Sequence, residues 1–131
     1  MGGSRRVVVL VVDDEPMVRN MVCALLERQG YAVLSANDGE EALTLSREYA
    51  GSIEMLLTDY RMPGITGLQL AEAVRRERPG IKVLLMSGKL SDSLHERGLP
   101  VPFLEKPFPA AVLWRKIAEV LKGADAGPQE I

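Results

Sequence analysis

The sequence predicts a doubly wound α/β domain, in which helices cover both faces of a five-stranded parallel sheet. Short aliphatic segments of strand length recur five times, and segments with helical signals lie between them. The aliphatic segments contain few polar residues, which is typical of strands that are covered on both faces. These segments are "VVVLVV" (7–12), "YAVLSA" (31–36), "IEMLLTD" (53–59), "IKVLLMS" (81–87) and "VPFLEK" (101–106).

Four of the connecting segments carry signals for helices. The first begins with Pro16 in its first turn and ends at Gly30, which suits a helix C-terminus. The second has acids in its first turn, where the positive end of the helix dipole favours them. Residues 88–100 are weak as a helix. The four helical segments are 16–30, 38–50, 67–80 and 109–123. The predicted apolar stripe of the first is Val18, Met21, Val22, Leu25 and Leu26.

Length and composition limit the classes of protein to which this chain can belong. The 131 residues fit one domain, predicted over residues 5–123, with 124–131 as a polar tail or the start of a linker. Sixteen basic against eighteen acidic residues argue against a nucleic-acid or anionic-membrane surface. The longest aliphatic run is far below the roughly 20 residues that span a bilayer. The single cysteine, Cys23, fits a reducing compartment. We therefore expect a cytoplasmic protein without nucleic-acid or membrane partners.

Polar residues follow four of the five predicted strands. In an open parallel sheet the binding crevice lies beyond the carboxyl ends of the strands. Asp13 and Asp14 follow the first strand, and Asp59 ends the third. Ser87 ends the fourth strand and Lys106 ends the fifth, whereas the second strand contributes nothing comparable and suits an edge position. Three carboxylates, a hydroxyl and an ammonium should therefore converge at one edge of the sheet.

Three carboxylates with one lysine are not balanced in charge. At ~4 Å and an effective dielectric constant near 20, each like-charged pair costs on the order of 4 kcal/mol. A divalent cation would offset this repulsion, and carboxylates open to water suit Mg²⁺. Zinc and copper match poorly, because no histidine or cysteine lies at these strand ends. We therefore expect Asp13 and Asp14 to hold Mg²⁺.

The same residues form a set suited to phosphoryl transfer. Lys106 and the metal would neutralise charge on the phosphoryl oxygens, and Ser87 would donate a hydrogen bond to one of them. Asp59 is then the candidate nucleophile, forming an acyl phosphate. Acids at a strand end are often merely solvated, and Ser87 alone could be a helix N-cap, so the prediction rests on the whole set.

Four motifs carry a resemblance to a known family. They are "DDE" after the first strand, "DYRMPGITG" (59–67), "MSG" (86–88) and "FLEKPF" (103–108). In this order, on these elements, the chain resembles the receiver domain of two-component response regulators. The last two motifs look especially similar to receivers that are fused to hybrid sensor kinases.

The resemblance implies a flavodoxin-like sheet with strand order 2-1-3-4-5. It implies that Asp59 accepts a phosphoryl group from a histidine kinase or a histidine phosphotransfer protein. Asp14, Asp59 and the backbone carbonyl of Arg61 would bind Mg²⁺ directly, and Asp13 chiefly through water. The implied chemistry is limited to Mg²⁺-dependent self-phosphorylation and self-dephosphorylation, so the chain is not expected to be an enzyme in the ordinary sense.

The resemblance also implies a switch. Ser87 and Lys106 would bind the phosphoryl oxygens, and the Lys106–Pro107 peptide bond would be cis. Phe103 matches an aromatic residue that rotates inward on activation, so Ser87 and Phe103 are the expected switch residues. Many relatives have threonine and tyrosine at these two positions. The output would be contact with a downstream protein that the sequence does not identify.

Two other classes of function remain as alternatives. A haloacid dehalogenase-type hydrolase also uses a nucleophilic aspartate, Ser or Thr, Lys and Mg²⁺, but it needs a D-x-D motif after the first strand, where this sequence has "DDE". A degenerate receiver could act only as a binding module, although every reactive position is filled here. Trp114 suits either packing or a partner surface, and the run "RRER" (75–78) is predicted to be a solvated face.

Overall fold

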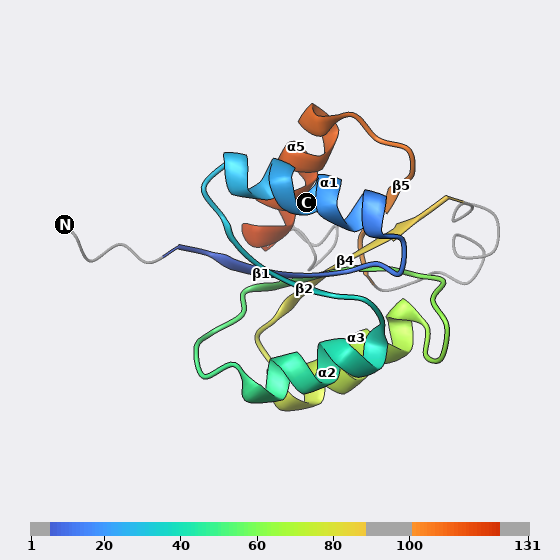
Figure 1. The fold of residues 1–131 in the computed structure, drawn as a ribbon. Coiled ribbons are helices and arrows are strands. Elements are labelled where there is room, and N and C mark those ends of the chain that lie inside the picture. The colour runs from blue at the N-terminus through green and yellow to red at the C-terminus, as the bar shows by residue number, and fades with distance from the viewer. Residues whose placement is uncertain (1–5, 89–100, 124–131) are drawn as a thin grey trace.

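The computed structural model describes residues 6–88 and 101–123, which form a five-stranded sheet between two layers of helices (Figure 1). The strands are β1 (Val8–Val12), β2 (Ala32–Ala36), β3 (Met55–Asp59), β4 (Lys82–Ser87) and β5 (Phe103–Glu105). The helices are α1 (Pro16–Arg28), α2 (Gly39–Glu48), α3 (Gly67–Glu77) and α5 (Ala110–Leu121). All strand pairs are parallel, in the order β2-β1-β3-β4-β5. The predicted fold class and strand order are confirmed, and β2 lies at an edge.

The residues of each central strand are buried alternately on the two faces of the sheet. Alternate residues of a strand point to opposite faces, so a strand that is apolar throughout supplies both. In β1, Leu10 and Val12 pack toward α2 and α3, whereas Val9 and Val11 pack toward α1 and α5. Figure 1 shows these helix pairs on opposite sides of the sheet. Burial on both faces explains why the central strands lack the polar alternation of a half-exposed sheet.

The helix boundaries follow the local signals closely. Pro16 opens α1, and Gly30, just beyond its end, has φ of 95°, a conformation that favours glycine. Thr66 caps α3 in a capping box with Gln69. Within the predicted stripe of α1, Val22 and Leu26 are fully buried, but Met21 is 46% exposed, so its inclusion was wrong. Met17 and Met21, four residues apart, share an exposed face of α1, so hydrophobicity alone did not mark the buried face.

Two side chains join elements that are distant in the sequence. The indole Nε1 of Trp114, on α5, donates to the backbone carbonyl of Leu25 on α1 at 3.0 Å, which supports packing as its role. Arg78 donates to the Ser46 hydroxyl and to the carbonyls of Ser46, Tyr49 and Gly51. Arg78 therefore holds the connection between α2 and β3, and the prediction that "RRER" is a solvated face was wrong for this residue.

Some expectations lie outside the described residues. They are the weak helical segment, all of which lies in 89–100 apart from Gly88, and the polar tail at 124–131. Among the residues that are described, no helix combines the length and apolar character that crossing a bilayer requires.

The loop from β3 to α3 folds back against the end of its own strand. The amide of Gly67 donates to the carbonyl of Tyr60 at 2.8 Å. A Cβ atom at position 67 would overlap the carbonyl oxygen of Asp59 and would lie 3.1 Å from the Cα of Tyr60. Glycine at this position therefore allows the close approach that sets the backbone of Asp59.

We predict that Gly67→Ala lowers the free energy of unfolding by roughly 1–3 kcal/mol, because the added methyl group forces the loop away from Asp59. Urea denaturation monitored by circular dichroism measures the change. Gly80→Ala is the matched control, since a Cβ there meets nothing within 4 Å. Equal effects of the two substitutions would show that the loop tolerates the methyl group.

Candidate functional site

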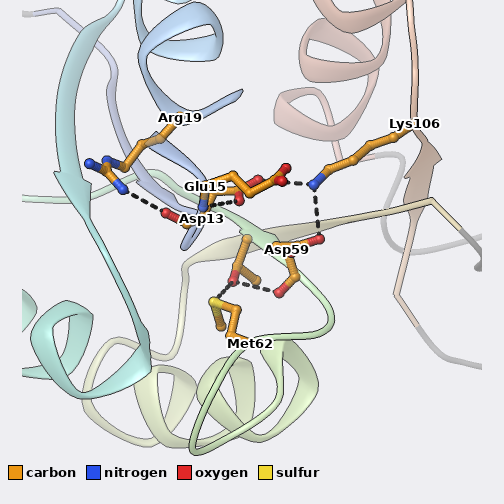
Figure 2. A network of polar contacts seen from close by, with 7 residues as sticks. Asp13, Glu15, Arg19, Asp59, Met62 and Lys106 are labelled. Carbon is orange, nitrogen blue, oxygen red and sulfur yellow. Dashed lines mark hydrogen bonds and ion pairs between the residues drawn. The ribbon is translucent and has the colours of Figure 1, made fainter. Parts of the chain in front are cut away.

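Three strand ends bring two carboxylates and an ammonium into contact (Figure 2). The Nζ atom of Lys106 lies 3.0 Å from Oδ2 of Asp13 and 3.2 Å from Oδ1 of Asp59. The strand register accounts for this meeting: Val12 pairs with Thr58, so the residues that follow them, Asp13 and Asp59, are level at the same edge. The prediction that side chains from β1, β3 and β5 converge is confirmed by these distances.

Asp14 completes a cluster of three carboxylates. One carboxylate oxygen from each of Asp13, Asp14 and Asp59 lies within 4.8 Å of the other two. Asp13 is fully buried and Asp59 is 8% exposed, whereas Asp14 is partly exposed. The cluster is therefore open to solvent on the Asp14 side. An all-oxygen donor set with one open side fits Mg²⁺, which retains several of its water ligands in proteins.

The lysine only partly offsets the burial of these acids. Desolvation raises the pKa of Asp59 to about 6, against the Coulombic attraction of Lys106 and with a smaller contribution from the charge of Asp13. Burial lowers the pKa of Lys106, but its hydrogen bonds and ion pairs with Asp13 and Asp59 outweigh burial and raise it overall. Lys106 is thus held as a cation, while a pKa of about 6 leaves Asp59 mostly ionised at neutral pH in the metal-free protein.

Asp13 is fixed through both of its carboxylate oxygens. Its Oδ2 accepts from Lys106, and its Oδ1 accepts from the backbone amide of Glu15 at 2.9 Å. The second contact turns the chain from the end of β1 toward α1. The carboxylate of Asp13 therefore helps to hold the site together, and it is less available to a ligand than the carboxylate of Asp14.

Ser87 lies at the same edge, on the strand between β3 and β5. Asp59 pairs with Met86 in the sheet register, so Ser87 is one residue beyond that pair. It is 3% exposed, and its carbonyl accepts from the amide of Lys106 at 2.9 Å. The ends of β4 and β5 are thereby joined next to the carboxylate cluster.

The remaining predicted residues surround this edge. The Lys106–Pro107 peptide bond is cis, as the resemblance implies. Phe103 opens β5 and is partly buried against the core on the α2 and α3 side. Arg61 follows Asp59 by two residues, and its exposed guanidinium carbon lies 6.0 Å from the centroid of the Tyr60 ring.

Two residues of this region, Arg19 and Thr58, were not predicted from the sequence. The Arg19 guanidinium donates to the carbonyl of Asp13 at 2.8 Å. The buried hydroxyl of Thr58 lies 3.0 Å from the carbonyl oxygen of Asp59 and 3.9 Å from the sulfur of Met62. Thr58 was detectable, because it is the one hydroxyl in the apolar run "MLLTD" of β3. Arg19 had no comparable signal, since its partner is a backbone atom.

We predict that Asp59→Asn stabilises the metal-free protein at neutral pH but not at low pH. The raised pKa means that ionised Asp59 costs stability, a cost that is absent below about pH 4 and complete above about pH 6. The shift from 3.8 to about 6 corresponds to at most about 3 kcal/mol. Denaturation in a metal chelator at several pH values measures the difference between variant and wild type. A difference that stays constant with pH would contradict the prediction.

Comparisons with known proteins agree with this geometry. The chain matches the response regulator receiver domain family over residues 9–118. It is 35% identical to the sensor kinase CckA of Brucella abortus, over 89% of this chain and 13% of that protein. It is 36% identical to the probable transcriptional regulatory protein TcrX of Mycobacterium tuberculosis, over 78% of this chain and 44% of TcrX. The chain thus spans less than half the length of either relative.

Solved structures show the same fold. The Vibrio cholerae chemotaxis protein CheY4 superimposes with a TM-score of 0.80 at 29% identity, over 88% of this chain and 99% of CheY4. The receiver domain of the hybrid histidine kinase CckA gives a TM-score of 0.74 at 38% identity, over 87% and 98% of the two chains. With the family match over most of its length and acids, serine and lysine at the expected strand ends, this chain belongs to the response regulator receiver domains, the phosphoaccepting modules of two-component signalling.

Proposed function

We propose that Asp59 is the phosphoacceptor of this receiver domain. The observation that carries the proposal is the environment of its carboxylate. Asp59 ends a buried strand with Lys106 Nζ 3.2 Å from Oδ1 and with oxygens of Asp13 and Asp14 within 4.8 Å. A carboxylate nucleophile must be ionised. With a pKa of about 6, Asp59 is mostly ionised at neutral pH, and a nearby cation favours this form further. Asp59 is therefore activated where a cation completes the site.

The donor set for Mg²⁺ would comprise the carboxylates of Asp14 and Asp59 and the backbone carbonyl of Arg61. Asp13 would reach the metal chiefly through water, because both of its oxygens already accept hydrogen bonds from the protein. Bound Mg²⁺ supplies positive charge that neutralises the phosphoryl oxygens as the group is transferred.

In the transfer step, a carboxylate oxygen of Asp59 forms a bond to phosphorus while the bond from phosphorus to a histidine nitrogen of the donor breaks. The electron pair of the broken bond stays on that nitrogen. Lys106 and the hydroxyl of Ser87 bind oxygens of the phosphoryl group and reduce its negative charge. The donor is a histidine kinase or a histidine phosphotransfer protein, a class that the sensor-kinase relative supports.

The phosphorylated site would act as a switch through the ends of β4 and β5. The backbone amide of Lys106 donates a hydrogen bond to the carbonyl of Ser87, so a shift of either residue toward the phosphoryl group would move both strand ends. Phe103 lies on β5, three residues before Lys106, and would reorient with it. The changed surface would bind a downstream protein, and the chemistry would otherwise be limited to self-phosphorylation and self-dephosphorylation.

The two alternative functions gain no support from the geometry. A dehalogenase-type hydrolase would require its nucleophile at the end of β1, where Asp13 is held by Lys106 and the amide of Glu15. A module that only binds partners would not require an acceptor carboxylate, a lysine and a metal-type donor set in contact.

We predict that phosphoramidate phosphorylates Asp59 alone and only when Mg²⁺ is present. The expected result is one added phosphoryl group by intact mass spectrometry in the wild type, and none in Asp59→Asn or in excess chelator. Asp38→Asn is the matched control, because Asp38 caps α2 and Asn is an equally good N-cap. Labelling of Asp59→Asn at the wild-type level would refute the assignment.

We predict different losses for the two phosphoryl-binding residues. Lys106→Ala removes a cation from the acid cluster, so Mg²⁺ binds at least as tightly while phosphorylation no longer switches the surface. Ser87→Ala removes one hydrogen bond and slows phosphorylation more mildly. Calorimetry of Mg²⁺ binding and amide NMR spectra with beryllofluoride separate the two effects. A Lys106→Ala protein that switches like the wild type would show that its assigned role is wrong.

A further inference from the structure

The position of Arg19 is unfavourable for an arginine unless specific contacts stabilise the side chain. It lies one turn into α1, close to the positive end of the helix dipole, which disfavours a cation. Its side chain is partly buried, and Nη1 donates to the carbonyl of Asp13 at 2.8 Å and to Oδ1 of Asn37 at 3.1 Å. These two contacts offset the unfavourable placement and direct the guanidinium to the loop between β1 and α1.

The carbonyl of Asp13 lies just beyond the sheet. The ladders of β1 with β2 and with β3 both end at Val12, and the amide of Asp13 makes only a long contact of 3.3 Å to the carbonyl of Ala36. The carbonyl of Asp13 therefore receives its hydrogen bond from Arg19 in place of a strand neighbour. In Figure 2, Arg19 reaches the backbone of Asp13 while Lys106 reaches its carboxylate.

This hydrogen bond constrains Asp14. The carbonyl of Asp13 and the amide of Asp14 belong to one planar peptide unit, so fixing the oxygen fixes the orientation of the plane. The plane in turn fixes the N–Cα bond of Asp14, about which its side chain can still rotate, and so limits the positions that the carboxylate can reach. Asp14 is the partly exposed member of the carboxylate cluster, where fewer packing contacts hold its carboxylate in place.

The guanidinium is itself anchored. Its second acceptor, Asn37, follows β2, and the amide of Asn37 donates to Oε1 of Glu41 in the first turn of α2. Arg19 therefore ties the loop that carries the acids to the connection between β2 and α2. An anchor at both ends makes the constraint on the Asp13–Asp14 peptide stiffer than a free side chain could.

We propose that Arg19 is a positioning residue, which holds the Asp13–Asp14 peptide so that Asp14 can bind Mg²⁺ together with Asp59. This proposal rests on the function proposed above for the carboxylate cluster. It goes beyond that function, because it assigns part of the metal affinity to Arg19, whose guanidinium binds the backbone of Asp13 and the side chain of Asn37.

The direction in which the Mg²⁺ affinity changes when Arg19 is removed distinguishes a positioning role from a purely electrostatic one. If Arg19 acted only as a nearby cation, its removal would relieve repulsion and Mg²⁺ would bind several-fold more tightly. If it positions Asp14, its removal weakens Mg²⁺ binding despite the lost repulsion. Outer partners of metal ligands commonly contribute a factor of 10–100 in metal affinity.

The experiment compares Arg19→Met, Arg19→Lys and Arg28→Met with the wild type. Met removes the charge and the donor at similar length, whereas Lys keeps both with a single donor point. Arg28→Met is the matched control, because it removes a cation from the far end of the same helix. Calorimetry gives the Mg²⁺ affinity, and the amide ¹⁵N shift of Asp14 in the metal-free protein reports on the peptide directly. Thermal unfolding confirms that each variant folds.

The expected result is that Arg19→Met weakens Mg²⁺ binding about tenfold and shifts the Asp14 amide, that Arg19→Lys recovers part of both, and that Arg28→Met changes neither. At saturating Mg²⁺ the rate of phosphorylation by phosphoramidate should return close to that of the wild type. Mg²⁺ binding by Arg19→Met that equals or exceeds wild-type binding would overturn the proposal alone. Absence of Mg²⁺ binding by the wild type would overturn it together with the function on which it rests.

Discussion

The contact of one ammonium with two carboxylates governs this molecule. Lys106 places Nζ within 3.2 Å of both Asp13 and Asp59, and so joins the ends of β1, β3 and β5. The two acids would repel each other more strongly without it. Even so, burial keeps the pKa of Asp59 raised despite the attraction of Lys106, and Asp13 adds to the effect. The site is therefore a locally unfavourable arrangement that the rest of the fold must stabilise.

The apolar core provides that stability. Residues on both faces of β1, β3 and β4 are fully buried, and two of the helices that the structure describes cover each face. Such a sheet is rigid enough to hold like charges at fixed positions, a combination that natural proteins retain mainly at functional sites. A cation or a phosphoryl group would change the balance of charge at this edge of the sheet. There, the backbone amide of Lys106 already donates to the carbonyl of Ser87. Small shifts at this edge can thus be transmitted to β5.

The part of this description that the sequence predicted follows from simple rules. Apolar runs located the strands, and the rule that binding sites lie beyond the carboxyl ends of parallel strands placed Asp13, Asp59 and Lys106 together. The strand order came from the resemblance to receivers and not from the residue pattern. Helix ends were predicted within two or three residues, because proline, glycine and capping residues mark them directly.

The missed features share a physical cause. Arg78 donates mainly to backbone carbonyls 27 to 32 residues away, and Arg19 donates to the carbonyl of Asp13. A backbone acceptor exists at every position, so such contacts leave no mark in composition or periodicity. Met21 was misplaced because an apolar side chain does not by itself mark the buried face of a helix: Met17 and Met21, four residues apart, are both exposed. Contacts between long side chains and distant backbone atoms can be identified only in the folded structure.

We expect the carboxylate cluster of Asp13, Asp14 and Asp59 to be complete only with a bound divalent cation. Thermal and urea unfolding of the wild type and of Asp14→Asn, with and without Mg²⁺ at neutral pH, test it most directly. A ligand that binds only the folded state at a hundred times its dissociation constant stabilises it by about 2.7 kcal/mol. We expect Mg²⁺ to stabilise the wild type by an amount of this order and Asp14→Asn by much less. Equal stability of the wild type with and without Mg²⁺ would show that the cluster does not bind the ion.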